Sequence, residues 1–383
     1  MLILSLALAL AAAAAVVNGT LAMPRYRGPR SDHFDGEHFH NLQPVVQARG
    51  GFFRWVLNRE RGPWREEPGA KPGPPPPRRV GPGELRVTFV NHATVLVQMD
   101  GFNVLTDPIW SERCSPVSWA GPKRSRPPGL RWEDLPPIDA VLISHNHYDH
   151  LDIPTLQRLA QDHRPRIYAA LGNGALLRSR GIPVTAELDW WQSVDLAPGL
   201  RLTSVPAQHF SNRTFTDRDR ALWTGFVIQG SAGAVYFAGD TALGPHFEQI
   251  RDKLGPIRLA LLPIGAFRPE WFMSPVHMSP ADAVKAHQLV GAATSVAIHF
   301  GTFQLGDDGI DEPVQLLQQA MQKLSPMRVR MVFATPQTPA IARSPSGIVV
   351  AISSNANSAR IPNMPVYSHC PIIMRSAPVA ACP

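Results

Sequence analysis

The sequence predicts a layered α/β protein in which two β-sheets pack face to face and helices cover them on the outside. Three observations predict this fold class. Short runs rich in β-forming residues come first, between residues 85 and 106. Beyond residue 140, apolar runs of strand character alternate with helical segments. Apolar residues make up 44% of the 383-residue chain, which is enough for a large core.

The expected strands are short apolar runs bounded by turn residues. They cover residues 85–90, 94–99, 103–106, 140–143, 167–170, 200–205, 223–229, 234–238, 259–263 and 295–298. Between the second and third of them lies Asp100-Gly101, a dipeptide typical of a two-residue hairpin turn. The second and third strands are therefore expected to form a hairpin.

Helices are expected between several of these strands, and two of them have recognisable N-termini. Residues 154–162 follow Asp152, which could cap the helix. Residues 279–289 begin with Ser279 and Pro280, a serine at the cap position and a proline at the first helical position. Two shorter helical segments are residues 52–61 and 174–179.

The composition divides the chain into four parts. Residues 2–17 are almost wholly apolar, which is short for a membrane span and typical of a signal peptide, so the protein is expected to be exported or membrane-associated. The proline run at residues 71–79 predicts a stiff polyproline linker. The four parts are a signal peptide or membrane anchor (1–22), an arm with the proline-rich linker (23–84), a core domain (85–343) and a poorly ordered tail (344–383).

The charge and the cysteines narrow the range of partners. A formal net charge of +7 fits anionic partners such as lipid headgroups or phosphorylated substrates. Zinc-finger spacing and basic repeats with interleaved aromatics are missing from the sequence, which argues against nucleic acid. The three cysteines, Cys114, Cys370 and Cys382, form no Cys-x-x-Cys pair, so neither a thiolate zinc site nor a disulfide framework is expected.

Imidazole and carboxylate side chains occur where predicted strands end, which is where open α/β sheets place their sites. The strand at residues 140–143 runs directly into a His-x-His-x-Asp-His segment, and three further candidates follow other strands. The seven candidates are His145, His147, Asp149, His150, His209, Asp240 and His299. Zinc binds imidazole nitrogen and carboxylate oxygen, so these residue types at four strand ends predict a metal site.

Five imidazoles and two carboxylates divide between two zinc ions, Zn(2+). One ion is assigned to His145, His147 and His209. The other is assigned to Asp149, His150 and His299, with Asp240 bridging the two, so both carboxylates are also catalytic candidates. Two metals about 3.5–4 Å apart can hold the attacking and leaving oxygens and lower the pKa of bound water towards about 7. Such a site needs no serine or cysteine nucleophile.

The segment Ser-His-Asn-His-Tyr-Asp-His at residues 144–150 resembles the signature of the metallo-β-lactamase superfamily. Further segments resemble the branch that contains N-acyl-phosphatidylethanolamine-hydrolysing phospholipase D and its bacterial relatives. These segments are residues 91–94, 105–108, 237–241 and 263–266, and above all 265–273, followed by His277 and residues 280–284. The resemblance is strong over residues 85–302 and weak over residues 31–36. It does not cover the tail.

The resemblance implies an αββα sandwich with a dimetal site at one edge between the sheets and the seven residues above as its ligands. It also places His277 near the substrate phosphate, where this loop histidine could donate a hydrogen bond as a catalytic group. Asp107 could order the metal-ligand loop by accepting hydrogen bonds, or be an ordinary turn or helix cap. The family usually has glycine where Asn91 stands, which could alter the turn before His92.

Three functions are compatible with these residues. The first is a phospholipase D-type phosphodiesterase that acts on N-acyl-phosphatidylethanolamine-like phospholipids at a membrane surface, in the bacterial envelope. The second is a lactonase or another ester or phosphoester hydrolase, and the third is a non-hydrolytic envelope protein that binds metal, or an iron redox protein. The absence of a flavin-binding segment argues against the redox version. Aromatics that would suit a membrane surface or the core are Trp55, Trp64, Trp271 and Phe272. A homodimer is an option.

Overall fold

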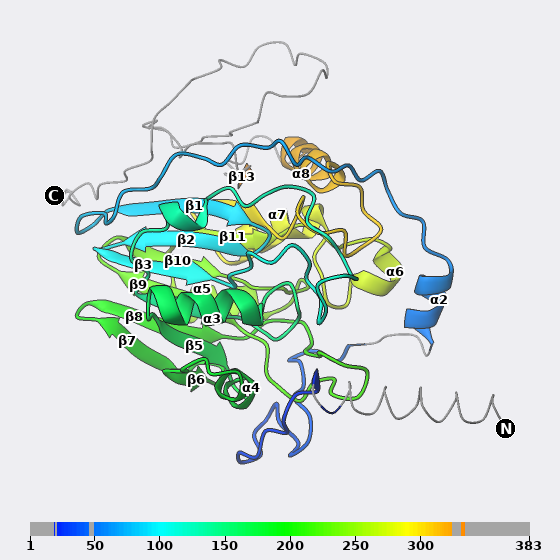
Figure 1. The fold of residues 1–383 in the computed structure, drawn as a ribbon, viewed down its shortest axis with the longest axis horizontal. Helices are drawn as coiled ribbons and strands as arrows, with labels where there is room; N and C mark the ends of the chain where they lie inside the picture. The colour runs from blue at the N-terminus through cyan, green and yellow to red at the C-terminus, as the bar shows by residue number, and fades with distance from the viewer. Residues whose placement is uncertain (1–18, 20, 46–49, 324–330, 334–383) are drawn as a thin grey trace, which may run out of the picture.

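The computed structural model describes residues 19, 21–45, 50–323 and 331–333. Within them, a six-stranded and a seven-stranded sheet pack against each other, with helices on the outer faces (Figure 1). The predicted α/β sandwich of αββα type is therefore confirmed. Most of the expected signal peptide or anchor and the whole expected tail, with Cys370 and Cys382, lie outside the described residues.

The first sheet begins with two antiparallel hairpins and continues with parallel strands. Its order is β1 (Leu85–Asn91), β2 (Thr94–Met99), β3 (Phe102–Thr106), β4 (Ala140–Ile143), β5 (Arg166–Ala170) and β6 (Ala186–Leu188). Asp100 and Gly101 connect β2 to β3 with φ angles of 50° and 78°. Two positive φ angles are what a tight primed turn requires, so the predicted hairpin is confirmed.

The second sheet is also mixed. Its order is β13 (Met331–Phe333), β12 (Thr294–Ile298), β11 (Ile257–Pro263), β10 (Gly233–Phe237), β9 (Gly225–Gly230), β8 (Leu200–Val205) and β7 (Ser193–Ala197). Strands β10 to β13 are parallel, whereas β7 to β10 are antiparallel. The ends of β4, β8, β10 and β12 carry the predicted ligand residues.

The core fills both faces of the first sheet. Along β2, Val95 and Val97 point into the cluster between the sheets, while Leu96 points into a second cluster beneath the outer helices. This alternation follows from the two-residue period of a strand. Burying each such side chain stabilises the fold by about 1.5–3 kcal/mol before conformational entropy is counted.

Helices cover the two outer faces. Helices α3 (Ile153–Asp162) and α4 (Gly174–Ser179) pack on the first sheet. Helices α5 (His246–Leu254) and α7 (Pro280–Leu289) cover the second sheet, and α8 (Glu312–Lys323) packs against α7. Shorter helices are α2 (Gly51–Leu57), α6 (Glu270–Met273) and the 3-10 turn Trp132–Asp134.

The two predicted helix caps have different outcomes. Ser279 begins α7 with a reciprocal capping box, in which its side chain accepts from Asp282 N. Asp152 does occupy the cap position of α3, but its side chain makes no cap hydrogen bond. Its carboxylate accepts instead from the hydroxyls of Ser111 and Thr155. Asp152 is thus the cap residue that the sequence suggested, but neighbouring hydroxyls occupy its carboxylate oxygens in place of the helix backbone.

The proline-rich segment 71–79 runs along the first sheet on the way from α2 to β1 (Figure 1). Gln98 donates to Pro77 O at 2.8 Å, and Asn103 donates to Arg78 O at 2.9 Å. The segment is thus fixed by hydrogen bonds to β2 and β3, while the domain boundary after residue 84 stays a prediction. Among the described residues, none of the helices is long and apolar enough to cross a membrane.

Candidate metal centre

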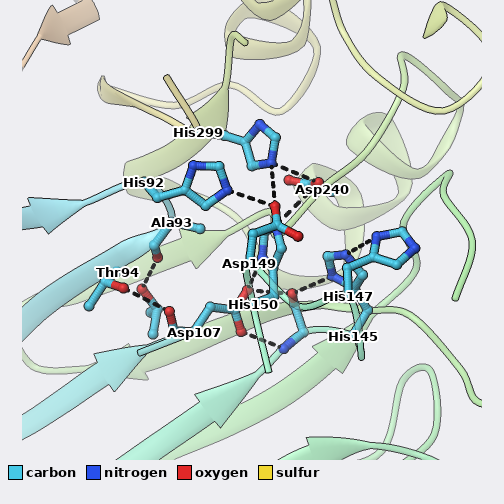
Figure 2. A network of polar contacts seen from close by, with 12 residues as sticks. His92, Ala93, Thr94, Asp107, His145, His147, Asp149, His150, Asp240 and His299 are labelled. Carbon is cyan, nitrogen blue, oxygen red and sulfur yellow. Dashed lines mark hydrogen bonds and ion pairs between the residues drawn. The ribbon is translucent and has the colours of Figure 1, made fainter. Parts of the chain in front are cut away.

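The seven predicted ligand residues converge at one edge of the sandwich. Residues 144–150, here called the metal loop, leave the end of β4, and the other three candidates follow β8, β10 and β12. Figure 2 shows imidazole rings of the metal loop and of His299 gathered around Asp149 and Asp240. The positions at strand ends therefore correctly identified side chains that the fold brings together, although they are up to 154 positions apart in the sequence, from His145 to His299.

One group consists of three imidazoles whose ring nitrogens face one another. His145 Nε2 lies 2.9 Å from His147 Nδ1, which lies 3.2 Å from His209 Nε2. The far nitrogens face acceptors: His147 Nε2 is 2.8 Å from Asn212 Oδ1, and His209 Nδ1 is 2.8 Å from Val276 O. Those far nitrogens must carry the protons, so the lone pairs of His147 and His209 point at each other.

Burial opposes protonation of these rings. It lowers the pKa of His147 to about 4, and it lowers the pKa of His145 and of His209 well below the ordinary value. Neighbouring imidazoles lower the pKa of each ring further. Three neutral rings with converging lone pairs fit a bound cation better than they fit shared protons.

The second group is built on two carboxylates. Asp149 Oδ2 lies 2.8 Å from His92 Nε2, 3.1 Å from His150 Nε2 and 3.3 Å from His299 Nε2. Asp240 Oδ2 lies 3.0 Å from His299 Nε2 and 3.3 Å from His150 Nε2. Burial alone would raise the pKa of both carboxyls, but the adjacent imidazoles outweigh it and hold both well below the usual range.

Asp240 also faces the first group. Its Oδ2 is 3.7 Å from His209 Nε2, and its other oxygen, Oδ1, is buried without a hydrogen-bond partner among the described residues. A carboxylate placed between two sets of imidazoles has the geometry expected of a bridging ligand. An unpartnered buried oxygen in this position also fits a metal ion.

Asp107 has the ordering role that the sequence left open. Its carboxylate accepts from Ser144 N at 2.7 Å and from Ser144 Oγ at 2.5 Å, and it lies 2.6 Å from His150 Nδ1. Because Nδ1 of His150 donates to this carboxylate, Nε2 is left to face Asp149 and Asp240. Ser144 Oγ is also 2.9 Å from His145 Nδ1, so one buried carboxylate organises the start of the metal loop.

His277 lies at the border of both groups. Its Nδ1 is 3.9 Å from Asp240 Oδ2 and has no hydrogen-bond partner among the described residues. Its ring centroid is 5.0 Å from that of His209 and 5.6 Å from that of His299. The structure thus brings this loop histidine to the cluster with one ring nitrogen unused.

Two side chains at the site were not predicted to belong to it. His92 contacts Asp149 and follows the end of β1, so the strand-end rule would have found it. Arg213 donates to Asn146 O at 2.9 Å and stacks 3.8 Å from the ring centroid of Tyr148, which pins the metal loop. No sequence signal points to this contact, because an arginine that binds backbone carbonyls needs no partner residue type.

The asparagine that replaces the usual glycine does not disturb the turn. Asn91 lies at the end of β1 and donates to Ile109 O at 3.1 Å. The left-handed residue is His92, with a φ of 44°. A side chain at position 91 is therefore compatible with the local backbone.

The donor set fits divalent metal ions such as zinc. It consists of imidazole nitrogens and carboxylate oxygens in clusters whose ligand atoms lie within 4.8 Å of one another. Cys114, the one cysteine among the described residues, is buried but belongs to none of these clusters. Imidazole and carboxylate suit zinc, and they also suit iron and manganese.

Comparisons with known proteins agree with this geometry. A sequence model of the β-lactamase superfamily domain matches residues 102–300. An uncharacterized protein of Mycobacterium tuberculosis is 44% identical over 243 residues, which are 62% of this chain and 64% of that protein. N-acyl-phosphatidylethanolamine-hydrolyzing phospholipase D 1 of Caenorhabditis elegans is 40% identical over 233 residues, 58% of this chain and 65% of the relative.

A relative of similar length to the matched region is a metal-dependent hydrolase of Methanopyrus kandleri. It is 32% identical over 222 residues, which are 57% of this chain and 85% of that protein. Among solved structures, an isothiocyanate hydrolase from Delia radicum gut bacteria has the same fold, with a TM-score of 0.52 at 22% identity over 66% of this chain and 97% of that one. The chain spans less than two thirds of the length of the mycobacterial and nematode relatives.

Proposed function

We propose that this chain, which belongs to the β-lactamase superfamily, is a metal-dependent hydrolase. More specifically, we propose a two-zinc phosphodiesterase that acts on N-acyl-phosphatidylethanolamine-like lipids. The reaction would be of the phospholipase D type, which releases the N-acylethanolamine. The observation that carries the proposal is the position of Asp240, whose Oδ2 faces His209 on one side and His150 and His299 on the other.

The two groups would each hold one ion, with Asp240 between them. His145, His147 and His209 would hold the first ion, and Asp149, His150 and His299 would hold the second. When bound, such ions act as Lewis acids on a phosphoryl oxygen and supply hydroxide at neutral pH. The protein contributes the fixed ring orientations, through Asp107 for His150 and Val276 O for His209.

His277 would bind the substrate phosphate. Its Nδ1 faces the centre without a hydrogen-bond partner among the described residues, and 12% of its side chain is exposed. A neutral imidazole in this place can donate a hydrogen bond to a phosphoryl oxygen as charge develops there. His277 would therefore orient the phosphate and stabilise the transition state.

An exposed apolar surface beside the centre supports a lipid substrate. Phe53 and Leu57 of α2 are 69% and 82% exposed, and Phe215 is 92% exposed. The ring of Phe52 lies between those of Phe53 and Phe215, with centroid distances of 5.7 Å and 6.3 Å. Trp271 on α6 is 46% exposed beneath the guanidinium of Arg54.

Apolar rings next to cationic side chains are typical of surfaces that lie in the headgroup region of an anionic bilayer. We therefore propose that this surface rests on the membrane. Of the four aromatics suggested from the sequence, Trp271 is exposed, while Trp55 and Phe272 stack on each other with ring centroids 5.1 Å apart and Trp64 is partly buried.

The deciding experiment is a substrate panel on the purified, zinc-loaded full chain. N-acyl-phosphatidylethanolamines of several acyl lengths should release N-acylethanolamine and phosphatidic acid. Lactones and simple phosphate esters form the other arms, because ring opening without phosphodiester cleavage would identify a lactonase instead. Iron in the native protein together with no hydrolysis would contradict any hydrolytic function.

A vesicle assay tests the membrane surface separately. The full chain should co-float with vesicles of phosphatidylcholine and phosphatidylglycerol more strongly than with phosphatidylcholine alone. Changing Phe53 and Leu57 to serine should weaken this binding while leaving cleavage of a detergent-dispersed lipid unchanged. Equal flotation of the variant would contradict the proposed surface.

A further inference from the structure

Residues 21–45, here called the arm, form the N-terminal segment that ends beside one of the metal-site histidines. Asn41 Nδ2 donates to His209 O at 2.7 Å, and His209 N donates to Asn41 Oδ1 at 3.0 Å. One side chain thus satisfies both backbone groups of His209, as a neighbouring strand would. The two residues are 168 positions apart in the sequence.

Adjacent contacts fix this pairing. Trp223 Nε1 donates to Asn41 Oδ1 at 2.9 Å, and since an indole nitrogen can only donate, the orientation of the amide is determined. Gln208, the residue before His209, pairs with Gln43 of the arm: Gln208 Nε2 donates to Gln43 O at 2.8 Å, and Gln43 N donates to Gln208 Oε1 at 3.4 Å. The arm therefore runs alongside the segment that leads from β8 to the metal centre.

The arm is itself firmly packed. Phe34 and Phe39 are almost completely buried against Trp190 and Trp223. At the other end of the arm, Met23 N donates at 2.7 Å to a carboxylate oxygen of the buried Asp217. A segment with these contacts can hold His209 in place, because displacing it would expose two phenylalanines and leave buried polar groups unpaired.

His209 depends on such support. It lies beyond the end of β8, where the hydrogen bonds of the sheet no longer hold the backbone. Val276 O orients its ring, but the two backbone groups are bound by Asn41 alone among the hydrogen bonds described. A shift of this backbone would move Nε2 away from His147 and Asp240.

We propose that the arm is a positioning element of the metal centre and acts through Asn41 on His209. Metal binding by His145, His147 and His209 and docking of the arm then strengthen each other, since coupling between two sites is reciprocal. The inference rests on the proposed metal centre and not on the proposed substrate.

The first test is the zinc affinity of the full chain, measured by competition with a chromophoric chelator. Asn41→Ala should lower the zinc affinity of the site formed by His145, His147 and His209 by about 10–100-fold. This is the usual effect of removing a group that orients a ligand. Asn58→Ala is the matched control, because that exposed amide donates only to Arg54 O at the end of α2. Its zinc affinity should equal that of the wild type.

The second test separates coupling from a merely structural role. Trypsin cleaves after Arg25, Arg27 and Arg30, which are exposed on the arm. Zinc should slow this cleavage in the wild type and should give no protection in Asn41→Ala. A purely structural asparagine would speed cleavage in the variant and leave the protection by zinc intact, which would overturn the proposal.

Two further results would also overturn it. Equal zinc affinity of wild type and Asn41→Ala would refute the coupling while leaving the metal centre in place. A wild-type chain that binds no zinc would refute both the metal centre and its coupling to the arm. The failures of the two proposals are thus distinguishable.

Discussion

The metal loop and the N-terminal arm are held in place in opposite ways. The metal loop leaves a central strand, and within seven residues it supplies four of the proposed ligands. The arm contains no regular helix or strand between residues 23 and 45, and its main contacts are with residues more than 150 positions away. The chemistry of the site is therefore concentrated in one short segment, whereas its geometry also depends on a distant one.

His145 and His147 of the metal loop differ from His33 of the arm in the direction of their pKa shifts. In the metal loop, burial lowers the pKa of His145, and the neighbouring imidazoles lower it further. In the arm, burial likewise lowers the pKa of His33, but hydrogen bonds to Asp189 and Asp32 outweigh it and raise the pKa above its ordinary value of 6.5. The rings of His145 and His147 are thus kept neutral, as ligands of a shared cation must be, whereas the arm keeps a proton on His33.

The largest effect is expected from removing the carboxylate between the two groups. Asp240→Ala should reduce hydrolysis by about 10³-fold, because a catalytic metal supplies several kcal/mol of transition-state stabilisation. Steady-state rates and the zinc content of the variant measure this. Asp252→Ala, which removes an exposed carboxylate of α5, should retain full activity and zinc. Normal activity in Asp240→Ala would contradict the assignment of the centre.

A smaller effect is expected from the residue that organises the metal loop from behind. Asp107→Ala removes the acceptor for Ser144 N and for His150 Nδ1, so zinc affinity should fall by about 10–100-fold. Asp107→Asn should recover part of the loss, since its amide oxygen can still accept one of these hydrogen bonds. Chelator competition measures both variants. An unchanged affinity in Asp107→Ala would mean that the loop holds its shape without this carboxylate.

The same contrast explains how much of the fold could be predicted from the sequence. The strand β2 was found with its observed bounds, because full burial on both faces gives a strong apolar pattern. The bounds of β8 and α4 also matched, although each carries exposed residues among its buried ones. The strands β6, β7 and β13 were missed, and all three lie at sheet edges. In β6 and β7, partial exposure admits polar residues such as Glu187 and Asp195 and weakens the pattern.

The site divides in the same way. The seven ligand candidates were recognisable because each has a metal-binding side chain at the end of a strand. Asn41 was not, because an amide in an irregular segment has no chemical signature and its partner is a backbone 168 positions away. Ligand residues can be recognised from their local sequence. Residues that hold a ligand in position can be recognised only when the fold brings distant segments together.

The smallest effect is expected from the proton on the arm. His33 lies 2.7 Å from Asp189 and 2.5 Å from Asp32, and its ring stacks on Trp190. Because the pKa of His33 is higher in the folded protein than its ordinary value of 6.5, its contribution to arm docking is fully present below that value. The contribution is lost as the pH rises through the folded pKa. Cleavage at Arg30, normalised to a peptide substrate at each pH, should therefore accelerate from pH 6 to pH 9.

A glutamine at this position tests whether His33 is the responsible group. His33→Gln can still donate one hydrogen bond but cannot titrate, so normalised cleavage of its arm should be independent of pH and faster at pH 6 than in the wild type. Zinc-loaded protein should show the same pH trend with slower cleavage at every pH, since the metal acts through Asn41 and not through His33. An identical pH profile in His33→Gln would assign the dependence to another group. Arm docking would then not depend on the proton of His33. The arm and the metal loop would still differ in how far apart in the sequence their contacts lie, but not in the role of a protonated histidine.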